Sequence, residues 1–166
     1  LPCIDSSEFP SLAETEMTNE IEIDPSKFIK MIDKTRFAIS NDESRYYLNG
    51  LFFQSYQHDN IKEIRTVATD GHRLALSFME NNFADNFSVI IPKKSVNEIR
   101  RIIDGVKKVS ISTSRTKIKI VADRSTIISK LIDGEFPEYQ KVLPKNNTQI
   151  ALVNRKNLFE CVDRVS

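Results

Sequence analysis

The 166-residue chain has no tryptophan, four glycines and two cysteines, and these scarcities exclude several kinds of protein. Cys3 and Cys161 lie near opposite ends, so they fit neither a metal-ligand spacing nor a disulfide framework, and we expect a reducing, cytoplasmic setting. No apolar run approaches the roughly 20 residues that span a membrane. The start has no basic stretch followed by an apolar core, which argues against a secretory signal. Because it also lacks an initiator methionine, we expect a fragment or a processed chain.

Neither sign of charge is in excess, with 24 Lys and Arg against 23 Asp and Glu. This balance argues against a wholly basic nucleic-acid binder but allows one basic face and one acidic face. The length suits one domain of roughly 100–150 residues plus additional segments. No P-loop, Gly-rich dinucleotide motif or HExxH motif occurs, so we expect no cofactor and no metal.

A short apolar strand, a Pro or Asn, and an amphipathic basic helix occur in this order three times. The copies turn into their helices at Pro25, Pro92 and Asn154, roughly 65 residues apart, which indicates a repeated unit of one helix and several strands. Asp24 and Asn154 are suitable N-caps, and Gly105 suits the residue after the second helix. The expected helices cover residues 26–40, 93–104 and 155–166.

Between the helices, apolar and polar residues alternate with a period of two, which is typical of half-buried antiparallel strands. The order is β-α-β-β-β, twice, followed by the start of a third copy. Helices on one side of antiparallel sheets make an α+β domain. The expected strands cover residues 21–23, 45–56, 62–69, 72–79, 88–91, 108–114, 116–123, 125–132 and 149–153.

Each expected helix carries several basic residues. A solvated helix face explains such residues in most proteins, but equivalent helices of a repeat share one surface, where their charges add up to a layer that attracts a polyanion. Tyr46 and Tyr47 could either contact nucleic acid or form a cross-strand aromatic pair, and both readings stay open. The basic sets are Lys27, Lys30 and Lys34; Lys93, Lys94, Arg100 and Arg101; and Arg155, Lys156 and Arg164.

Asp70 and His72 are the one closely spaced carboxylate–histidine pair, and a hydrolase would use His72 as a general base. No Ser or Cys nucleophile in a known motif accompanies them. Asp-Gly is also a common turn pair, so we expect Asp70 to serve a turn. His58 is isolated in a polar segment and does not complete a metal-ligand set.

Four segments carry a resemblance to a known family. Residues 65–75 resemble the hallmark segment of the bacterial DNA polymerase III β subunit, the sliding clamp. Residues 45–50 resemble the strand after the first helix of its middle domain, residues 133–145 the segment that joins its middle and last domains, and residues 8–12 its first linker. Their order and spacing agree along nearly the whole chain.

The resemblance implies a DNA-clamp fold of two β-α-β-β-β units, with two inner helices packed on outer antiparallel sheets. Residues 1–13 would be the tail of a first clamp domain with its linker, residues 14–139 the middle domain, and residues 140–166 a linker with the start of the last domain. Two full-length subunits of this family close a ring around duplex DNA. The implied function is therefore that of a non-catalytic processivity factor in the cytoplasm.

The resemblance also implies two sites. One is a pocket for short Leu/Phe-containing peptides of the polymerase III catalytic subunit, the clamp loader and repair proteins. Carried over by motif, its residues are Arg45, Leu48, Thr69, Gly71, His72, Arg73, Leu74, Pro137, Lys141 and Val142. The other is a DNA-facing surface of Tyr46, Tyr47, Lys93 and Lys94, to which the helical pattern adds Arg100 and Arg101. A hydrolase that uses Asp70 and His72, and a peptide-binding adaptor that never contacts DNA, are the competing functions.

Overall fold

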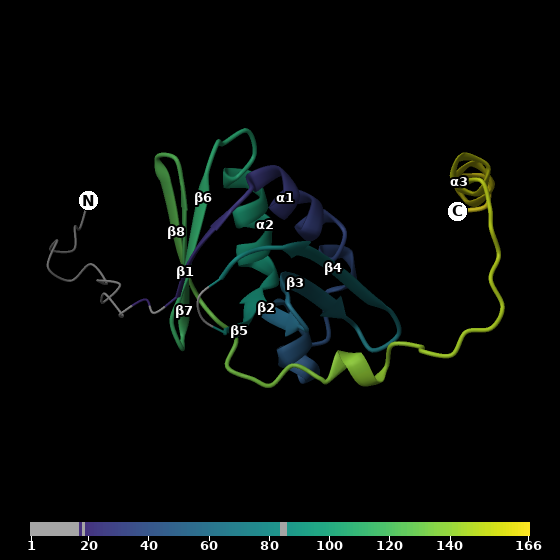
Figure 1. Ribbon diagram of the computed structural model, residues 1–166, viewed down its shortest axis with the longest axis horizontal. Coiled ribbons are helices and arrows are strands. Elements are labelled where there is room, and N and C mark those ends of the chain that lie inside the picture. The colour runs from purple at the N-terminus through teal and green to yellow at the C-terminus, as the bar shows by residue number, and fades with distance from the viewer. Residues whose placement is uncertain (1–16, 18, 84–85) are drawn as a thin grey trace, which may run out of the picture. The chain divides into compact units, whose positions relative to one another are not determined.

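The computed structural model describes residues 17, 19–83 and 86–166, which form two compact units divided after Phe136. The first unit contains two successive sets of one strand, one helix and three strands (Figure 1). The first set is β1 (Asn19–Ile23), α1 (Pro25–Asp33), β2 (Gly50–His58), β3 (Ile61–Thr69) and β4 (Leu74–Glu80). The second set is β5 (Ser88–Pro92), α2 (Lys93–Ile102), β6 (Val109–Thr113), β7 (Lys117–Ala122) and β8 (Ser125–Lys130).

The two sets interlock through their first strands. The strand orders are β1-β6-β7-β8 and β4-β3-β2-β5, all antiparallel, so each set contributes its first strand to the sheet of the other. Ile21 lies opposite Ile111 in one sheet, and Phe52 lies opposite Ile90 in the other. Neither set can complete its sheet alone, so the first unit is expected to fold as one cooperative domain.

The alternation seen in the sequence determines which side chains enter the core. Strand β6 buries Val109, Ile111 and Thr113 while the intervening serines are half-buried, and α2 buries Val96 and Ile99. The core is continuous between both sheets and both helices. The α+β clamp-type architecture expected from the sequence is confirmed.

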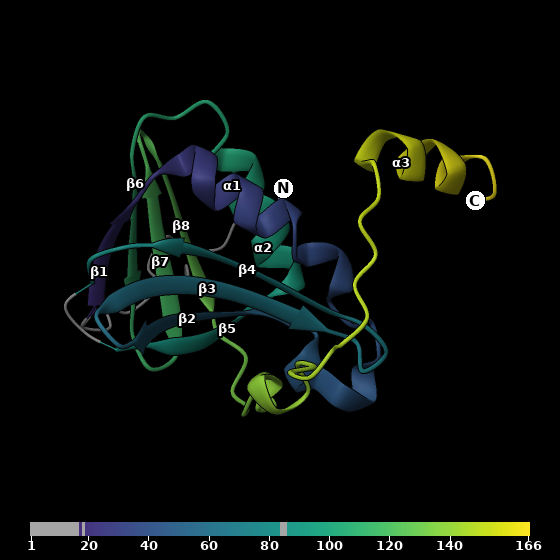
Figure 2. The same cartoon turned by 45° about the vertical axis from the view of Figure 1, so that its right-hand side comes forward.

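The two long helices of the first unit lie side by side (Figures 1 and 2). The carboxylate of Asp24 accepts the backbone N–H of Lys27 at 3.0 Å, and Pro25 occupies the first turn, as expected. Helix α1 is shorter than expected because it ends at Asp33, and a 3-10 helix, η2 (Arg36–Ala38), follows. Gly105 has φ +74° just beyond α2, a conformation that glycine adopts without strain.

Two expected strands are wrong. Residues 43–48 form a 3-10 helix, η3, whose first N–H groups are capped by Asp42, so β2 begins only at Gly50. The expected strand over residues 149–153 has no regular secondary structure, because a strand needs a hydrogen-bonding neighbour and the second unit contains no other strand in its described residues 137–166.

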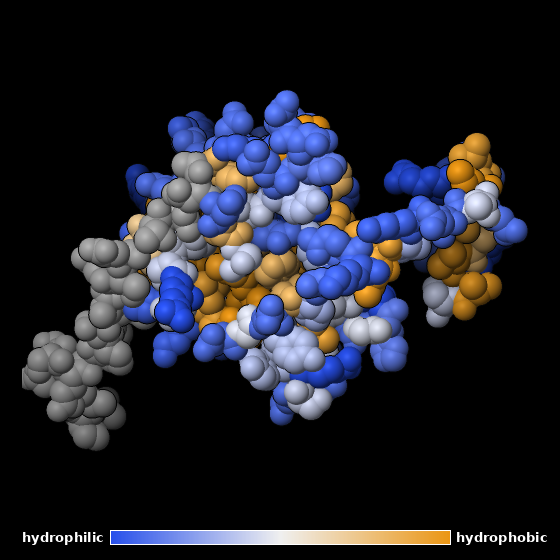
Figure 3. All heavy atoms as spheres, turned by 60° about the horizontal axis from the view of Figure 1, so that its bottom comes forward, coloured by the Kyte–Doolittle hydropathy of each residue, from blue (hydrophilic) through white to orange (hydrophobic). Residues whose placement is uncertain are grey.

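The second unit contains a 3-10 helix, η4 (Tyr139–Lys141), and a helix, α3 (Arg155–Asp163). Asn154 caps α3 by accepting the N–H groups of Lys156 and Asn157, as expected. The apolar residues of α3 are exposed, and their side chains are visible on its surface in Figure 3. The first-domain tail and linker expected over residues 1–13, and Cys3 with them, lie outside the described residues.

Candidate functional site

The turn between β3 and β4 is built around one carboxylate. Asp70 Oδ1 accepts the backbone N–H groups of His72 at 2.9 Å and Arg73 at 3.0 Å. The hydroxyl of Thr69 donates to the carbonyl oxygen of Arg73 at 2.8 Å and accepts the N–H of Gly71 at 3.1 Å. Gly71 has φ +91°, which glycine adopts without strain. The turn therefore holds His72 and Arg73 exposed at one end of the sheet.

The guanidinium of Arg73 is fixed from two sides. Its Nε donates to Asp70 Oδ2 at 3.0 Å, and its Nη2 donates to the carbonyl oxygen of Phe37 at 3.0 Å. The exposed Phe37 ring also lies 5.6 Å from the guanidinium carbon, within the range of a cation–π interaction. Arg73 thus joins η2 to the β3–β4 turn while its side chain remains 60% exposed. A fixed, exposed guanidinium can bind a carboxylate or a peptide carbonyl.

Arg45 brings η3 to the same turn. Its Nε donates to Asp42 Oδ2 at 2.9 Å, and its Nη1 lies 2.7 Å from the position that a Cβ atom on Gly71 would occupy. A larger residue at position 71 would therefore displace the Arg45 guanidinium. The structure thus brings together Arg45, Gly71 and Arg73, which the sequence assigned to one site.

The apolar residues of the expected pocket differ in accessibility. Leu74 is half-buried at the start of β4, whereas Leu48 is only 4% exposed and can offer a ligand little surface in this structure. Pro137, Lys141 and Val142 belong to the second unit, where all three are exposed and Lys141 pairs with Glu138. Within the first unit, the accessible pocket surface is therefore formed by the turn and Leu74.

Asp70 does not orient a histidine base. Its carboxylate is engaged by backbone N–H groups and the Arg73 guanidinium, and these hydrogen bonds lower its pKa from 3.8 to about 2. The turn interpretation is confirmed, and the geometry gives no support to a catalytic pair. The other histidine, His58, lies 3.5 Å from Asp59 at the tip of the β2–β3 hairpin. No group of three metal-ligating side chains occurs in the described residues 17, 19–83 and 86–166.

The lowered pKa of Asp70 predicts part of the acid sensitivity of the protein. Because its folded-state pKa lies below its ordinary value, the carboxylate stabilises the fold above about pH 4, and this contribution is lost as the pH falls toward 2. Urea unfolding of Asp70→Asn at pH 5, 3 and 2 should therefore show a smaller fall in the free energy of unfolding than wild type. An identical fall in both proteins would contradict this role.

The expected DNA-facing tyrosines lie on η3, so they are not a cross-strand pair. Tyr46 is 55% exposed, and its ring meets that of Tyr47 edge to face at 5.8 Å. Both also pack against Gly134, where a Cβ atom would lie 3.1 Å from the Cβ of Tyr47. Close approach of this backbone explains the glycine, and the rings gain a rigid support.

The start of α2 adjoins these tyrosines. The backbone N–H of Lys93 donates to the carbonyl oxygen of Asn49, which directly follows η3, and its Nζ donates to Asn41 Oδ1 at 2.6 Å. Lys94 is exposed beside it. The structure thus places Lys93 and Lys94 close to the segment that carries Tyr46 and Tyr47. A basic group near exposed aromatic rings can contact a phosphate backbone.

The two arginines added from the helical pattern are occupied within the chain. Arg100 Nε donates to both carboxylate oxygens of Asp33 on α1 at 3.1 Å, and Arg100 also lies 3.6 Å from Asp104. These carboxylates raise its pKa. Arg101 pairs with Glu98 at 2.6 Å. Their charges are partly neutralised, so their contribution to a basic surface is smaller than the sequence suggested.

Asp42 and Phe37 position two of the site arginines, and the sequence reasoning missed both. An Asp two residues before a Ser is a common turn and capping signal, so Asp42 could have been found. Phe37 acts through its carbonyl oxygen, and a backbone group leaves no signal in a sequence. Among the described residues, no helix is both long and apolar enough to span a bilayer.

Comparisons with known proteins agree with this geometry. Residues 22–138 match the family model of the DNA polymerase III beta subunit, central domain. The beta sliding clamp of Caulobacter vibrioides is 37% identical over the whole of this chain, and that of Pseudomonas aeruginosa is 33% identical. The chain spans 45% of the length of each of these relatives.

Solved structures give the same result. A crystal structure of the C. crescentus beta sliding clamp with bound PEG superposes with a TM-score of 0.92 at 36% identity over 99% of this chain and 45% of that one. The sliding clamp of Bartonella birtlesii bound to griselimycin superposes with a TM-score of 0.89 at 39% identity over 98% of this chain and 44% of that one. The chain therefore belongs to the family of the DNA polymerase III beta subunit, whose central domain it contains.

Proposed function

We propose that the full-length protein is a sliding clamp: a non-catalytic ring of two subunits that encircles duplex DNA in the cytoplasm and tethers a replicative polymerase. The observation that carries this proposal is the joining of Arg45, Gly71 and Arg73 at one end of a sheet, where the β3–β4 turn and η3 meet. The chain would contribute the tail of a first domain (residues 1–13), a middle domain (14–139) and the start of a last domain (140–166).

The peptide site is proposed to comprise the β3–β4 turn, Arg45 and Leu74, with Leu48 beneath them and Pro137, Lys141 and Val142 from the next segment. Its ligands would be short Leu/Phe-containing segments of the polymerase III catalytic subunit, the clamp loader and repair proteins. The ligands held by the Caulobacter and Bartonella clamps support a binding site in this family. An apolar surface with a few fixed polar groups suits such peptides.

Leu74→Asp is expected to weaken binding of an acetylated peptide ending in Leu-Phe to the full-length protein. Wild type should bind with a dissociation constant on the order of micromolar, because the interface is small. Loss of one apolar anchor should cost about 1–2 kcal/mol. Fluorescence anisotropy measures the change, and Ile61→Asp is the matched control, because Ile61 is exposed in the β2–β3 hairpin. Equal affinities of both variants would remove the site assignment.

The DNA-facing surface is proposed to comprise Tyr46, Tyr47, Lys93 and Lys94, with a lesser contribution from Arg100 and Arg101. Interactions with phosphates carry no sequence information, so they allow a ring to slide. Substituting both Lys93 and Lys94 by Ala should weaken DNA binding equally on unrelated sequences. The slope of log affinity against log salt should fall by about 0.9 for each phosphate that no longer has a lysine partner.

The control for the DNA experiment replaces Lys107 and Lys108 by Ala, which removes the same charge beyond α2. This pair should leave both affinity and salt slope near wild type. A decrease in affinity that depends on DNA sequence would point to base readout and contradict a sliding clamp. Absence of any binding to duplex DNA at low salt, with peptide binding intact, would favour an adaptor that never contacts DNA.

A further inference from the structure

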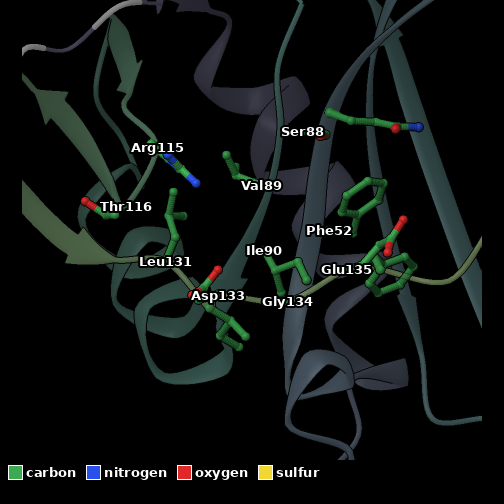
Figure 4. Close-up of a pocket in the computed structure, with 13 residues that line it drawn as sticks. Phe52, Ser88, Val89, Ile90, Arg115, Thr116, Leu131, Asp133, Gly134 and Glu135 are labelled. Carbon is green, nitrogen blue, oxygen red and sulfur yellow. The ribbon is translucent and has the colours of Figure 1, made fainter.

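A groove separate from the β3–β4 turn lies in the first unit, beside β5 and the end of β8. Its volume is about 750 Å³, within the range of sites that hold small ligands or short peptide segments. Figure 4 shows β5 running through it, with Val89 and Ile90 between Arg115 on one side and Glu135 on the other. Apolar side chains gather on this face of the first unit (Figure 3). We call it the β5 groove.

One wall of the β5 groove is an open strand edge. The N–H of Ser55 donates to the carbonyl oxygen of Phe87, and the N–H of Ile132 donates to that of Ile90. Backbone groups alternate in direction along a strand, so Phe87 and Val89 face β2, whereas Ser88 and Ile90 face away from it. The N–H and C=O of Ser88 and the N–H of Ile90 are therefore directed along the outer edge of β5. Ser88 is also exposed.

The groove adds an apolar surface. Phe52 and Phe136 stack in parallel planes, with ring centroids 4.6 Å apart and an angle of 2°. Phe136 is almost buried, whereas Phe52 is half-buried and lies opposite Ile90 in the sheet. The stack holds the segment after β8 on β2. A rigid aromatic surface beside an open strand edge can accept an apolar side chain.

The charged residues of the groove are separated by sign. Arg115, in the turn between β6 and β7, is exposed and extends toward Val89 (Figure 4). No ion pair of Arg115 occurs within the described ranges 17, 19–83 and 86–166. Asp133 and Glu135 line the groove on the segment after β8. A ligand with a carboxylate near Arg115 would therefore be favoured in one orientation.

We propose that the β5 groove binds a short extended segment of a partner protein that carries an acidic side chain. The segment adds a strand of about three residues to the edge at Ser88 and Ile90, its carboxylate pairs with Arg115, and an apolar side chain rests on Phe52. Strand addition supplies main-chain hydrogen bonds, and the neighbouring side chains supply specificity. The site is independent of the turn that holds Arg73.

The probe is the peptide acetyl-Val-Glu-Val-Thr-amide, added to the ¹⁵N-labelled chain and followed by NMR. The amide signals of Ser88 and Ile90 should shift with saturation at about 0.1–1 mM, because the interface is small. The same peptide with an N-methyl group on its Glu nitrogen lacks one donor and should bind at least tenfold more weakly. The Lys analogue of the peptide should also bind at least tenfold more weakly.

Two variants test the walls of the groove. Ser88→Pro removes a donor from the outer edge, where proline is tolerated, and should abolish binding. Arg115→Glu should weaken the Glu peptide about tenfold and make the Lys analogue the better ligand. Leu74→Asp should leave both affinities unchanged, which separates this site from the proposed peptide pocket. Absence of saturable shifts up to 5 mM peptide, equal binding of the Glu and Lys peptides, or disappearance of the shifts in Leu74→Asp would overturn the proposal.

Discussion

Truncation of Phe53 to alanine is expected to lower the free energy of unfolding by about 3–5 kcal/mol, because the side chain leaves a cavity in a closely packed core. The ring is wholly buried, with centroids 5.7 Å from Phe28 on α1 and 5.1 Å from Phe87 before β5. It therefore joins elements of both strand-helix sets. The truncation removes packing that the interlocked sheets share.

Urea unfolding of the chain, followed by circular dichroism, measures this effect. Phe78→Ala is the matched control, because Phe78 is 57% exposed on β4 and its truncation should change stability by no more than about 0.5 kcal/mol. A destabilisation below about 1 kcal/mol in Phe53→Ala would show that the core can close around the missing ring. The unfolding transition should remain single in both variants.

Much of the fold could be predicted from the sequence, because periodicity reports burial directly. The positions of Val96 and Ile99 on one face of α2, and of Ile111 between half-buried serines on β6, follow from the spacing of apolar residues. Asp24 and Asn154 cap their helices as expected, since capping depends on local chemistry alone. Local patterns therefore located most of the helices and strands.

Features that depend on distant partners could not be predicted in this way. The exchange of β1 and β5 between sheets is a pairing choice, and the sequence pattern of each strand is the same for either partner. Residues 45–48 alternate well enough for a strand, yet the hydrogen bonds of Asp42 favour a 3-10 helix. Residues 149–153 have a strand pattern without a neighbouring strand.

The site was only partly predictable for the same reason. Resemblance to a family identified Arg45 and Arg73, but their positioning by Asp42 and by the Phe37 carbonyl oxygen appears only in three dimensions. The helical pattern placed Arg100 on an outer face, whereas Asp33 from another helix pairs with it. Charge patterns on one element cannot report the carboxylates that a neighbouring element contributes.

Gly50→Ala is expected to lower the free energy of unfolding by about 2–3 kcal/mol, because the site has no room for a methyl group. A Cβ atom there would lie 2.6 Å from the carbonyl oxygen of Ile91, 2.7 Å from Cγ2 of Ile90 and 3.0 Å from Cδ1 of Ile132. Backbone atoms of β5 cannot rotate away as a flexible side chain can. The strand pair β2–β5 would have to separate at the residue where η3 joins β2.

Differential scanning calorimetry compares this variant with Gly105→Ala, a glycine with φ +74° and nothing within 4 Å of the added Cβ. Gly105→Ala should cost about 1 kcal/mol through backbone strain alone. Adding Ile132→Ala to Gly50→Ala removes the clash with Cδ1 but leaves that with the Ile91 carbonyl oxygen, so it should not restore stability. Restoration by this second change would show that side-chain crowding, and not the approach of two strands, requires glycine at position 50.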